Sequence, residues 1–480
     1  MLKRAIVVWG ATSGAGKSFI AAALARLARR RGLRAAPFKA QNMSNNARAA
    51  EGFEIATAQY WQALAAGVAP QPDHNPVLLK PEADTASQVV VHGRIRRDLS
   101  ALPWRARSPV LAAAARESFE RLAQAHELLV IEGAGSPAEI NLADCDFVNL
   151  EAARWAAARA PTAALLAVDI DRGGAFAHAV GTLALLPEDL RPLVRAVVLN
   201  RFRGDAALLE PGRDWLRERT GAAVAVLPML HGHALPEEDG PALHGTGSGP
   251  TVGIVCAPRA SNLDEFSALA ASGARLRFVR APQEADDVDL LVLPGSKQTI
   301  SDLAWLRAQG LDALLRDWAH VGRPLLGICG GMQMMGRMLH DPLGLEGAPG
   351  SVAGLGLFDY DTTLETEKQL RVVQGRLCPG GEAVRGYEIH MGVSAGPALA
   401  RPAVELEHGP DGARSADGQL MATYLHGLFD APQACAALLA WAGLEAAEPL
   451  DLHALREASL DRLADCIEAE IDVERMCGFR

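Results

Sequence analysis

The chain has 480 residues, of which 49% are hydrophobic and 22% are charged, and its formal net charge is −10. At roughly 100–200 residues per domain this length predicts two or three domains, and the acidic balance excludes a protein that coats nucleic acid. Only six of the 47 Lys and Arg residues are lysines: Lys3, Lys17, Lys39, Lys80, Lys297 and Lys368. Because an ammonium differs from a guanidinium in shape and donor geometry, we expect lysines to mark positions that arginine cannot serve.

The cysteine pattern and the apolar runs indicate a compartment. The seven cysteines are scattered and form no Cys-x-x-Cys pair, which argues against a disulfide framework or a zinc ribbon and favours a reducing cytoplasm. The apolar run that begins at Ala5 ends after five residues, which is too short for the core of a signal peptide. No stretch approaches the roughly 18 uninterrupted apolar residues of a membrane span. We therefore expect a cytoplasmic protein without a membrane segment.

Short apolar runs alternate with Ala/Arg/Leu stretches at helical spacing, and this order predicts parallel sheets with helical crossovers. In the first half the runs are Ala5–Trp9, Leu128–Ile131, Ala163–Val168, Ala196–Leu199 and Ala223–Leu227, and in the second half they are Val252–Cys256, Val288–Leu293 and Pro324–Ile328. Between the two sets, a Gly- and Pro-rich stretch without apolar periodicity is typical of a linker. We predict two parallel-sheet α/β domains over 1–235 and 251–440, joined by a linker over 236–250 and followed by a helical segment over 441–480.

Residues 10–18 read Gly-Ala-Thr-Ser-Gly-Ala-Gly-Lys-Ser, after the first predicted strand and before a helix predicted over 19–30. A P-loop needs this order, because glycine-rich backbone N–H groups wrap a phosphate and the helix N-terminus adds positive potential. The Lys17 ammonium would reach the terminal phosphates, and the Ser18 hydroxyl would bind Mg²⁺. ATP or GTP is therefore expected at Thr12, Ser13, Gly14, Ala15, Gly16, Lys17 and Ser18; the alternative is a glycine-rich turn that binds no nucleotide.

Carboxylates that follow the predicted strands are candidates for the metal and the substrate. Glu132 ends the strand Leu128–Ile131, where a carboxylate faces the nucleotide crevice, so it is the second candidate ligand of Mg²⁺. The alternative is an ordinary charged loop residue. Asp144 and Asp146 are weaker candidates for magnesium or substrate, since solvated turn carboxylates would look the same in the sequence.

A polar segment over 37–46 follows the next strand position and is dense in amides and hydroxyls. Such side chains recognise a polar substrate without adding negative charge, although a helix N-cap would account for one of them. The candidate substrate residues of this segment are Lys39, Gln41, Asn42, Ser44 and Asn45.

A second site is predicted where the apolar strand Pro324–Ile328 is followed by Cys329 between glycines and then by a helical run. A nucleophile at such a tight turn is exposed, its neighbours' N–H groups can bind an oxyanion, and the helix N-terminus favours the thiolate. A cysteine nucleophile needs a histidine, for which His426 is the candidate and His390 competes. Gly330 and Gly295 are the candidate oxyanion donors.

These residues carry a resemblance to known families. The segment Gly327–Gly331 resembles the nucleophile elbow of the class I, triad-type glutamine amidotransferases, and the first half resembles the dethiobiotin-synthetase-like P-loop ATPases. Together the two halves resemble the glutamine-hydrolysing synthases that amidate corrinoids. The matching blocks span 39–44, 75–81, 132–142, 169–174, 200–205, 386–392 and 424–427.

The resemblance implies an N-terminal P-loop NTPase domain, a C-terminal flavodoxin-like amidotransferase domain and the activity of an ATP-dependent amide ligase. It implies ATP with Mg²⁺, glutamine as nitrogen donor, and a corrinoid substrate, adenosylcobyrinic acid a,c-diamide, amidated at its b, d, e and g carboxylates. In most of the class a Glu stands two residues after the histidine, whereas this chain has Leu428. Either another group orients His426, or hydrolysis is slow unless the other site is occupied.

Two alternative functions stay open. A cobyrinic acid a,c-diamide synthase shares both modules. The block Lys39–Ser44 and the amidotransferase half nevertheless favour amidation of the a,c-diamide at its b, d, e and g carboxylates. A regulatory P-loop ATPase with an inactive amidotransferase-like half is the other alternative. The intact Cys329 argues against it, whereas the missing Glu leaves it open. The sequence predicts no particular oligomeric state.

Overall fold

The computed structural model describes residues 1–83, 86–235, 249–444 and 451–474. The chain forms two compact units: unit 1 comprises 1–44, 53–239 and 456–480, and unit 2 comprises 45–52 and 240–455. Most of the predicted linker, at 236–248, and parts of the predicted C-terminal segment, at 445–450 and 475–480, lie outside the described residues. Across the described ranges, no helix is long and apolar enough to cross a membrane.

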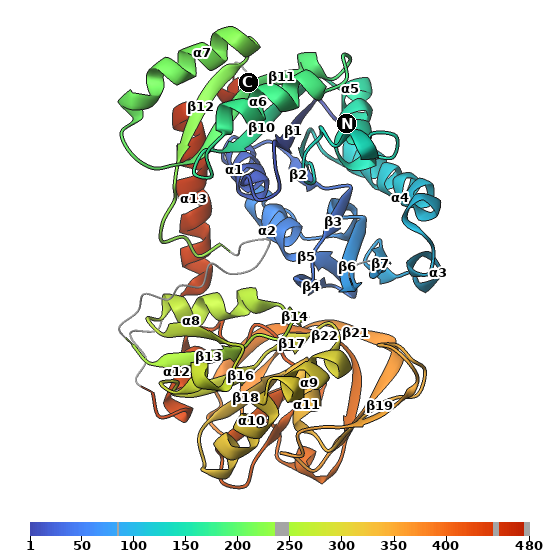
Figure 1. The fold of residues 1–480 in the computed structure, drawn as a ribbon, viewed down its shortest axis with the longest axis vertical. Helices are drawn as coiled ribbons and strands as arrows, with labels where there is room; N and C mark the ends of the chain where they lie inside the picture. Colours follow the sequence, from blue (N-terminus) through green and yellow to red (C-terminus); the bar gives the residue numbers. More distant parts are fainter. Residues whose placement is uncertain (84–85, 236–248, 445–450, 475–480) are drawn as a thin grey trace. The chain divides into compact units, whose positions relative to one another are not determined.

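Unit 1 is built around a parallel sheet with the strand order β12-β11-β10-β1-β9-β2 (Figure 1). Val7 and Trp9 of β1 belong to one apolar cluster and Ile6 and Val8 to another, so both faces of the sheet are buried, as parallel sheets require. The predicted parallel sheet of this half is confirmed. Its strands are β1 (Arg4–Gly10), β2 (Ala35–Phe38), β9 (Leu128–Glu132), β10 (Thr162–Asp169), β11 (Val194–Phe202) and β12 (Ala223–Pro228).

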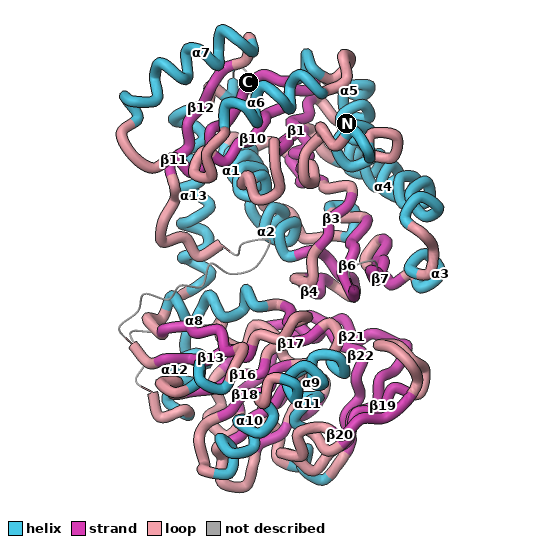
Figure 2. Tube along the Cα trace, viewed as in Figure 1, coloured by secondary structure: helices cyan, strands magenta, loops and turns pink. Residues whose placement is uncertain are grey.

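Helices cover both faces of this sheet (Figure 2). One face packs against α1 (Lys17–Arg30) and α13 (Leu452–Glu470), and the other against α4 (Trp104–Ala125), α5 (Ala152–Arg159), α6 (Ala175–Leu185) and α7 (Glu210–Thr220). Ion pairs join α1 to α13, with Arg26 Nε 2.7 Å from Asp461 Oδ1 and Arg30 Nη1 2.6 Å from Asp465 Oδ1. The remaining elements of unit 1 are α2 (Thr57–Ala66), α3 (Arg97–Ser100), β5 (Phe53–Ala56) and a small sheet of β3 (Gln41–Met43), β6 (Val77–Ala83), β7 (Ala86–Val91) and β8 (Arg94–Ile95).

Unit 2 contains a second sheet, in the order β15-β13-β16-β18-β26-β25, which is parallel except for β25. The three runs predicted as strands in this half form β13, β16 and β18. The strands are β13 (Thr251–Val255), β15 (Arg275–Val279), β16 (Leu290–Leu293), β18 (Leu325–Ile328), β25 (Ala413–Arg414) and β26 (Leu420–Thr423). The helices are α8 (Ser267–Ala271), α9 (Thr299–Ala308), α10 (Leu311–His320), α11 (Gly330–Met335) and α12 (Pro432–Trp441).

A mostly antiparallel sheet in unit 2 was not part of the sequence prediction. It consists of β19 (Met338–Asp341), β20 (Gly350–Ala353), β21 (Asp361–Leu377), β22 (Ala383–Ala395), β23 (Val404–Leu406) and β24 (Gly409–Asp411). The longest strand, β21, mixes exposed polar with apolar residues, so no continuous apolar run marks it. The shorter strands of unit 2 are β4 (Ala47–Ala50) and the antiparallel pair β14 (Ala260–Ser261) and β17 (Gly295–Ser296).

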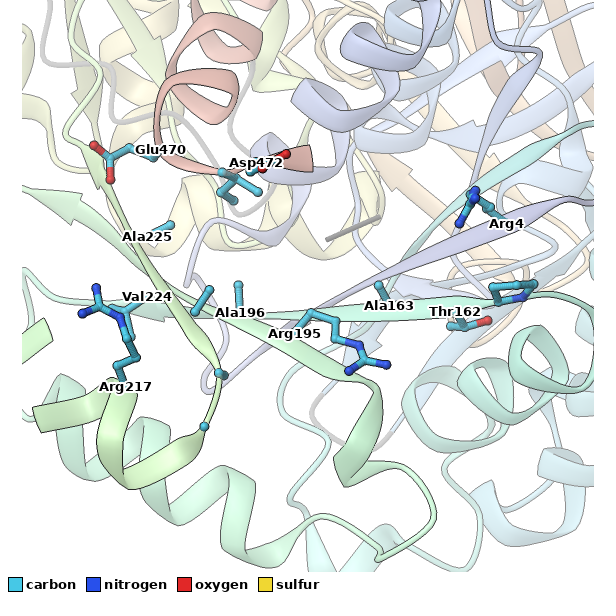
Figure 3. Close-up of a pocket in the computed structure, with 15 residues that line it drawn as sticks. Arg4, Thr162, Ala163, Arg195, Ala196, Arg217, Val224, Ala225, Glu470 and Asp472 are labelled. Atoms are coloured by element: carbon cyan, nitrogen blue, oxygen red, sulfur yellow. The ribbon is translucent and has the colours of Figure 1, made fainter. Parts of the chain in front are cut away.

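A cavity of about 720 Å³ lies at the amino ends of the strands of unit 1. Arg4, Thr162 and Arg195, near the starts of their strands, line it together with Glu470, the last residue of α13 (Figure 3). The P-loop follows the carboxyl end of β1, which is the opposite edge of the sheet. This cavity is therefore not the predicted nucleotide site.

Candidate functional site

The predicted phosphate-binding residues lie in one turn between β1 and α1. Gly14 and Gly16 have φ angles of 68° and 90°, which strain any residue with a side chain. A Cβ on Gly16 would also collide with the amide nitrogen of Asn200, which donates to the carbonyl oxygen of Ala15 at 2.9 Å. Lys17 Nζ folds back over the turn and lies 3.3 Å from the carbonyl oxygen of Thr12. The loop thus has the backbone that a phosphate cradle requires.

Glu132 connects the P-loop to the polar segment after β2. Its carboxylate is fully buried and accepts hydrogen bonds from Ser18 Oγ and Lys39 Nζ, both at 2.8 Å from Oε1. Gln59 and Gln62 of α2 donate to Oε2 at 3.1 and 2.5 Å. A buried carboxylate needs such a set of donors because desolvation penalises its charge. The structure therefore brings together three predicted site residues: Ser18, Lys39 and Glu132.

The residues present fit a magnesium ion at this position. The Ser18 hydroxyl and the Glu132 carboxylate are hard oxygen donors that already lie 2.8 Å apart. Mg²⁺ at nucleotide sites takes one or two protein ligands of this kind and completes its shell with water and phosphate oxygens. In the described part of the chain, no group of three or more His, Cys, Asp or Glu side chains could hold a metal ion.

The other candidate substrate residues have different environments. Gln41 and Asn42 are buried, and Asn42 donates to Gln59 Oε1 at 2.9 Å, whereas Gln41 Oε1 is buried without a hydrogen-bond partner. Ser44 ends the first part of unit 1, and Asn45 begins the segment that belongs to unit 2. Gln41 and Asn45 thus each have a buried side-chain oxygen available to a ligand, since Asn45 Oδ1 also has no hydrogen-bond partner.

Asp146 has a local structural role. Its Oδ1 accepts from the backbone N–H groups of Val148 and Asn149 at 3.0 and 2.7 Å, and its Oδ2 accepts from Asn149 Nδ2 at 3.0 Å. It is the N-cap of the π-helical turn η3 (Phe147–Glu151). Asp144 is paired with the exposed Arg105 at 2.7 Å. A substrate contact by Asp146 stays a prediction.

Cys329 occupies a strained turn between β18 and α11. Its φ of 53° and ψ of −106° lie outside the regions that non-glycine residues normally populate, as at other nucleophile elbows. Glycine is required around it, since a Cβ on Gly330 would lie 2.6 Å from the Ser296 nitrogen, and a Cβ on Gly295 would lie 3.0 Å from His426 Cε1. The structure therefore gathers the predicted nucleophile, histidine and oxyanion glycines.

Glu265 supplies the carboxylate that the sequence did not reveal. His426 Nδ1 lies 3.0 Å from Glu265 Oε1, and the backbone N–H of Gly427 donates to Glu265 Oε2 at 3.2 Å. Both side chains are buried, with 1% and 0% exposed for His426 and Glu265. The Cys329 side chain is hydrogen-bonded to the imidazole, whose Nε2 also lies 3.5 Å from Asn262 Nδ2. Cys329, His426 and Glu265 thus form a triad in which the acid comes from η6 (Leu263–Phe266).

The charge of Glu265 changes the acidity of the imidazole. Burial on its own lowers the pKa of His426, but the Glu265 carboxylate and the Cys329 sulfur outweigh it and raise the pKa to about 10. The imidazolium form is therefore favoured at neutral pH. A protonated imidazole beside the sulfur stabilises a thiolate and can later protonate a leaving amine.

His390, the competing candidate, is held elsewhere. Its Nδ1 lies 2.8 Å from the carbonyl oxygen of Gly392, its ring stacks on Tyr424 at 3.8 Å between centroids, and its Nε2 lies 3.9 Å from Glu388 Oε1. His390 lies on β22, and the hydrogen bond from Cys329 Sγ to this strand goes to the main chain, at 3.7 Å from the carbonyl oxygen of Ile389. The geometry pairs Cys329 with His426.

Sequence reasoning missed several residues of the two sites. Gln59 and Gln62 lie one helical turn apart on α2, which reads as an ordinary helix, and Glu265 lies 161 residues from His426. A detectable signal existed for Asn200 and for Arg172, whose guanidinium approaches Gly14, because both fall in blocks of the family resemblance.

Two family models match the chain, one over the part that contains the P-loop and one over the part that contains Cys329. Residues 6–238 match the family model of the CobQ/CobB/MinD/ParA nucleotide binding domain, and residues 251–434 match that of the CobB/CobQ-like glutamine amidotransferase domain. The chain thus joins a P-loop nucleotide-binding domain to a glutamine amidotransferase domain, and it is an enzyme of the amidotransferase or ligase kind.

Solved structures give distant similarities to parts of the chain. A crystal structure of a glutamine amidotransferase is 19% identical and covers 40% of this chain and 98% of its own, with a TM-score of 0.32. PurLQS from Thermotoga maritima is 14% identical over 45% of this chain and 98% of its own, with a TM-score of 0.31. The signal recognition particle receptor FtsY from Elizabethkingia anophelis, in complex with GDP, is 17% identical over 47% of this chain and 57% of its own, with a TM-score of 0.30.

Proposed function

We propose that the chain is a glutamine-hydrolysing cobyric acid synthase, which uses ATP and glutamine to amidate the b, d, e and g carboxylates of adenosylcobyrinic acid a,c-diamide. The observation that carries the proposal is the Cys329–His426–Glu265 triad on the same chain as a P-loop. The corrinoid substrate is supported by the blocks of family resemblance and by the matches to a CobQ/CobB/MinD/ParA nucleotide binding domain and a CobB/CobQ-like glutamine amidotransferase domain.

In the glutaminase half, the Cys329 thiolate attacks the side-chain carbonyl carbon of glutamine, and the N–H groups of Gly330 and Gly295 bind the resulting oxyanion. The His426 imidazolium then protonates the amide nitrogen, the C–N bond breaks, and ammonia leaves a glutamyl thioester. Water, deprotonated by His426, hydrolyses the thioester to glutamate. Glu265 keeps the imidazole oriented throughout, in the role that the acid plays in other triads.

In the synthetase half, a corrinoid carboxylate oxygen attacks the γ-phosphorus of ATP, and ADP leaves. The acyl phosphate then reacts with ammonia, and phosphate departs as the amide forms. Lys17 and the backbone of the P-loop hold the phosphates, while Ser18 and Glu132 would hold Mg²⁺, which offsets negative charge during phosphoryl transfer. The buried amide of Gln41 is a candidate contact for the polar substrate.

Mass spectrometry of the corrinoid after incubation with ATP, Mg²⁺ and glutamine tests the proposal. Four successive amide additions to the a,c-diamide are expected, whereas two additions to cobyrinic acid would identify an a,c-diamide synthase. Cys329→Ala should abolish synthesis from glutamine and retain synthesis from concentrated ammonia. A wild-type chain that amidates neither corrinoid and hydrolyses no glutamine would support the regulatory ATPase.

A further inference from the structure

Residues 45–52, which begin with the last two residues of the polar segment 37–46, belong to unit 2. There they contact the turn that precedes Glu265. The backbone N–H of Asn262 donates to Asn46 Oδ1 at 3.0 Å, and the N–H of Ala47 donates to Asn262 Oδ1 at 3.1 Å. Asn262 has a φ of 56°, a left-handed conformation that few residues other than glycine, asparagine and aspartate adopt. Its Nδ2 lies 3.5 Å from His426 Nε2, so the supported residue borders the imidazole.

Arg48, on β4, fixes the residue next to Glu265. Its Nη2 lies 2.8 Å from Asp264 Oδ2, and the two side chains are 6% and 2% exposed. Removing one partner of a buried ion pair leaves the other charge uncompensated, so the remaining partner moves or draws in water. Because Asp264 and Glu265 are consecutive residues of η6, movement of Asp264 displaces the carboxylate that binds His426 Nδ1.

The same guanidinium supports the imidazole from its ring face. Arg48 Cζ lies 5.3 Å from the ring centroid of Tyr387, and the Tyr387 ring stacks on His426 with 5.2 Å between centroids and 16° between planes. Tyr387 and His426 also exchange two backbone hydrogen bonds of 3.1 and 2.9 Å. Arg48 therefore contacts Tyr387, which stacks on the imidazole, and Asp264, which is next to the carboxylate that pairs with Nδ1.

We propose that Arg48 is a positioning residue of the glutaminase reaction, acting through Asp264 and Tyr387 to hold Glu265 and His426 against Cys329. The N-terminal half of the sequence thereby supplies part of the glutaminase site through β4. This inference rests on the proposed function only for glutamine hydrolysis at Cys329 and does not depend on the identity of the acceptor.

The test compares full-length wild type with Arg48→Met and Arg48→Lys. Arg323→Met is the matched control, because Arg323 also stacks on an aromatic ring, that of Trp318, within unit 2. Glutamate release from glutamine gives kcat and KM, and ammonia-supported synthesis reports on the other half. We expect Arg48→Met to lower kcat by about 10- to 100-fold with KM within twofold, since a misplacement of about 1 Å costs up to about 10²-fold. Arg48→Lys should recover only part of the kcat lost in Arg48→Met. A lysine ammonium lacks the planar guanidinium that pairs with Asp264 and also stacks on Tyr387.

A double-mutant cycle with Asp264→Asn tests the route. If Arg48 acts through Asp264, the double variant should lose no more than about twofold beyond Arg48→Met. Four results would overturn the proposal: an unchanged kcat, a raised KM at unchanged kcat, an equal loss in Arg323→Met, or a parallel loss of ammonia-supported synthesis. A wild type that hydrolyses glutamine without amidating corrinoid, together with a slowed Arg48→Met, would support the positioning role while refuting the proposed function.

Discussion

Replacing Glu265 by Gln should disable glutamine hydrolysis while leaving the shape of the site unchanged. The carboxylate accepts from His426 Nδ1 at 3.0 Å and from the N–H of Gly427 at 3.2 Å. An amide has only one oxygen. If that oxygen accepts from Gly427, the NH₂ group faces Nδ1 and places the proton on Nε2, which then cannot take the proton of Cys329. If the oxygen faces Nδ1, the NH₂ group opposes the N–H of Gly427.

The size of the effect follows from the burial of the pair. Neither side chain is more than 1% exposed, so water does not screen the lost charge. Hydrogen bonds to charged groups contribute about 1.5–3 kcal/mol each, and two such bonds are lost or weakened. A loss of about 3–5 kcal/mol of transition-state stabilisation corresponds to roughly 10²- to 10⁴-fold in kcat. Removing the charge also leaves burial to lower the pKa of His426 from its present value of about 10.

Glutamate release measures the loss, and ammonia-supported synthesis shows that the rest of the chain still works. Glu388→Gln is the matched control, because Glu388 is another buried glutamate beside a histidine, 3.9 Å from His390 Nε2. We expect it to retain kcat within about threefold. A strong loss in Glu388→Gln with little loss in Glu265→Gln would refute the assignment and would make His390 the operative histidine.

Three further predictions concern stability. Burial lowers the pKa of His426, but Glu265 and Cys329 raise it overall to about 10. The stabilisation of the folded state by the His426 imidazolium is therefore complete below about pH 6.5 and is lost as the pH rises toward 10. In denaturant titrations, the free energy of unfolding of wild type should fall more steeply across this pH window than that of Glu265→Gln. Glu132→Gln removes the carboxylate from the buried Lys39–Glu132 ion pair and should lower the free energy of unfolding by about 3–5 kcal/mol, part of which Lys39→Met restores in the double variant; no recovery would contradict the pairing. Arg26→Met should have a lower thermal midpoint than wild type at low salt. The difference between the two midpoints should be smaller at 1 M salt, because the partners Glu457 and Asp461 are partly exposed and salt screens their charges. An identical difference at both salt concentrations would show that these charges do not contribute to stability.

The two turns that the sequence predicted, and that the structure contains, are encoded locally. The P-loop and the turn around Cys329 each combine an apolar strand, glycines and a helix start within about a dozen residues. At both positions glycine is needed for a positive φ or for a close approach, which the sequence records directly. His426 was identified because it follows a short strand, and the structure shows that strand, β26, paired with β18.

The features that the sequence did not reveal depend on contacts between distant residues. Glu265 lies 161 residues from His426, and Arg48 lies 216 residues from Asp264. The neighbours Asp264 and Glu265 form no motif, and two consecutive carboxylates are typical of a solvated turn. Their burial follows from packing that places Arg48 and His426 against them, which composition and periodicity do not encode.

The lysine pattern also acquires a structural meaning. Lys17, Lys39 and Lys80 are all buried, and the latter two pair with the buried carboxylates of Glu132 and Glu54 at 2.8 and 2.5 Å. A compact ammonium fits such a site beside one carboxylate oxygen, whereas a planar guanidinium needs more space and more acceptors. These three lysines are thus placed where the shape of the cation matters, whereas Lys3 of the same half is exposed and pairs with Glu127.

The position of the acid has a consequence for how the glutaminase site is assembled. A Glu two residues after the histidine would be oriented by the same short stretch of backbone that carries the imidazole. Here that position is Leu428, which is fully buried, and the acid comes instead from η6. Its geometry then depends on what holds η6, namely Asn46, Ala47 and Arg48 from the N-terminal half of the sequence. Moving the acid therefore makes the orientation of His426 sensitive to residues 45–48, a dependence that a local acid would not have.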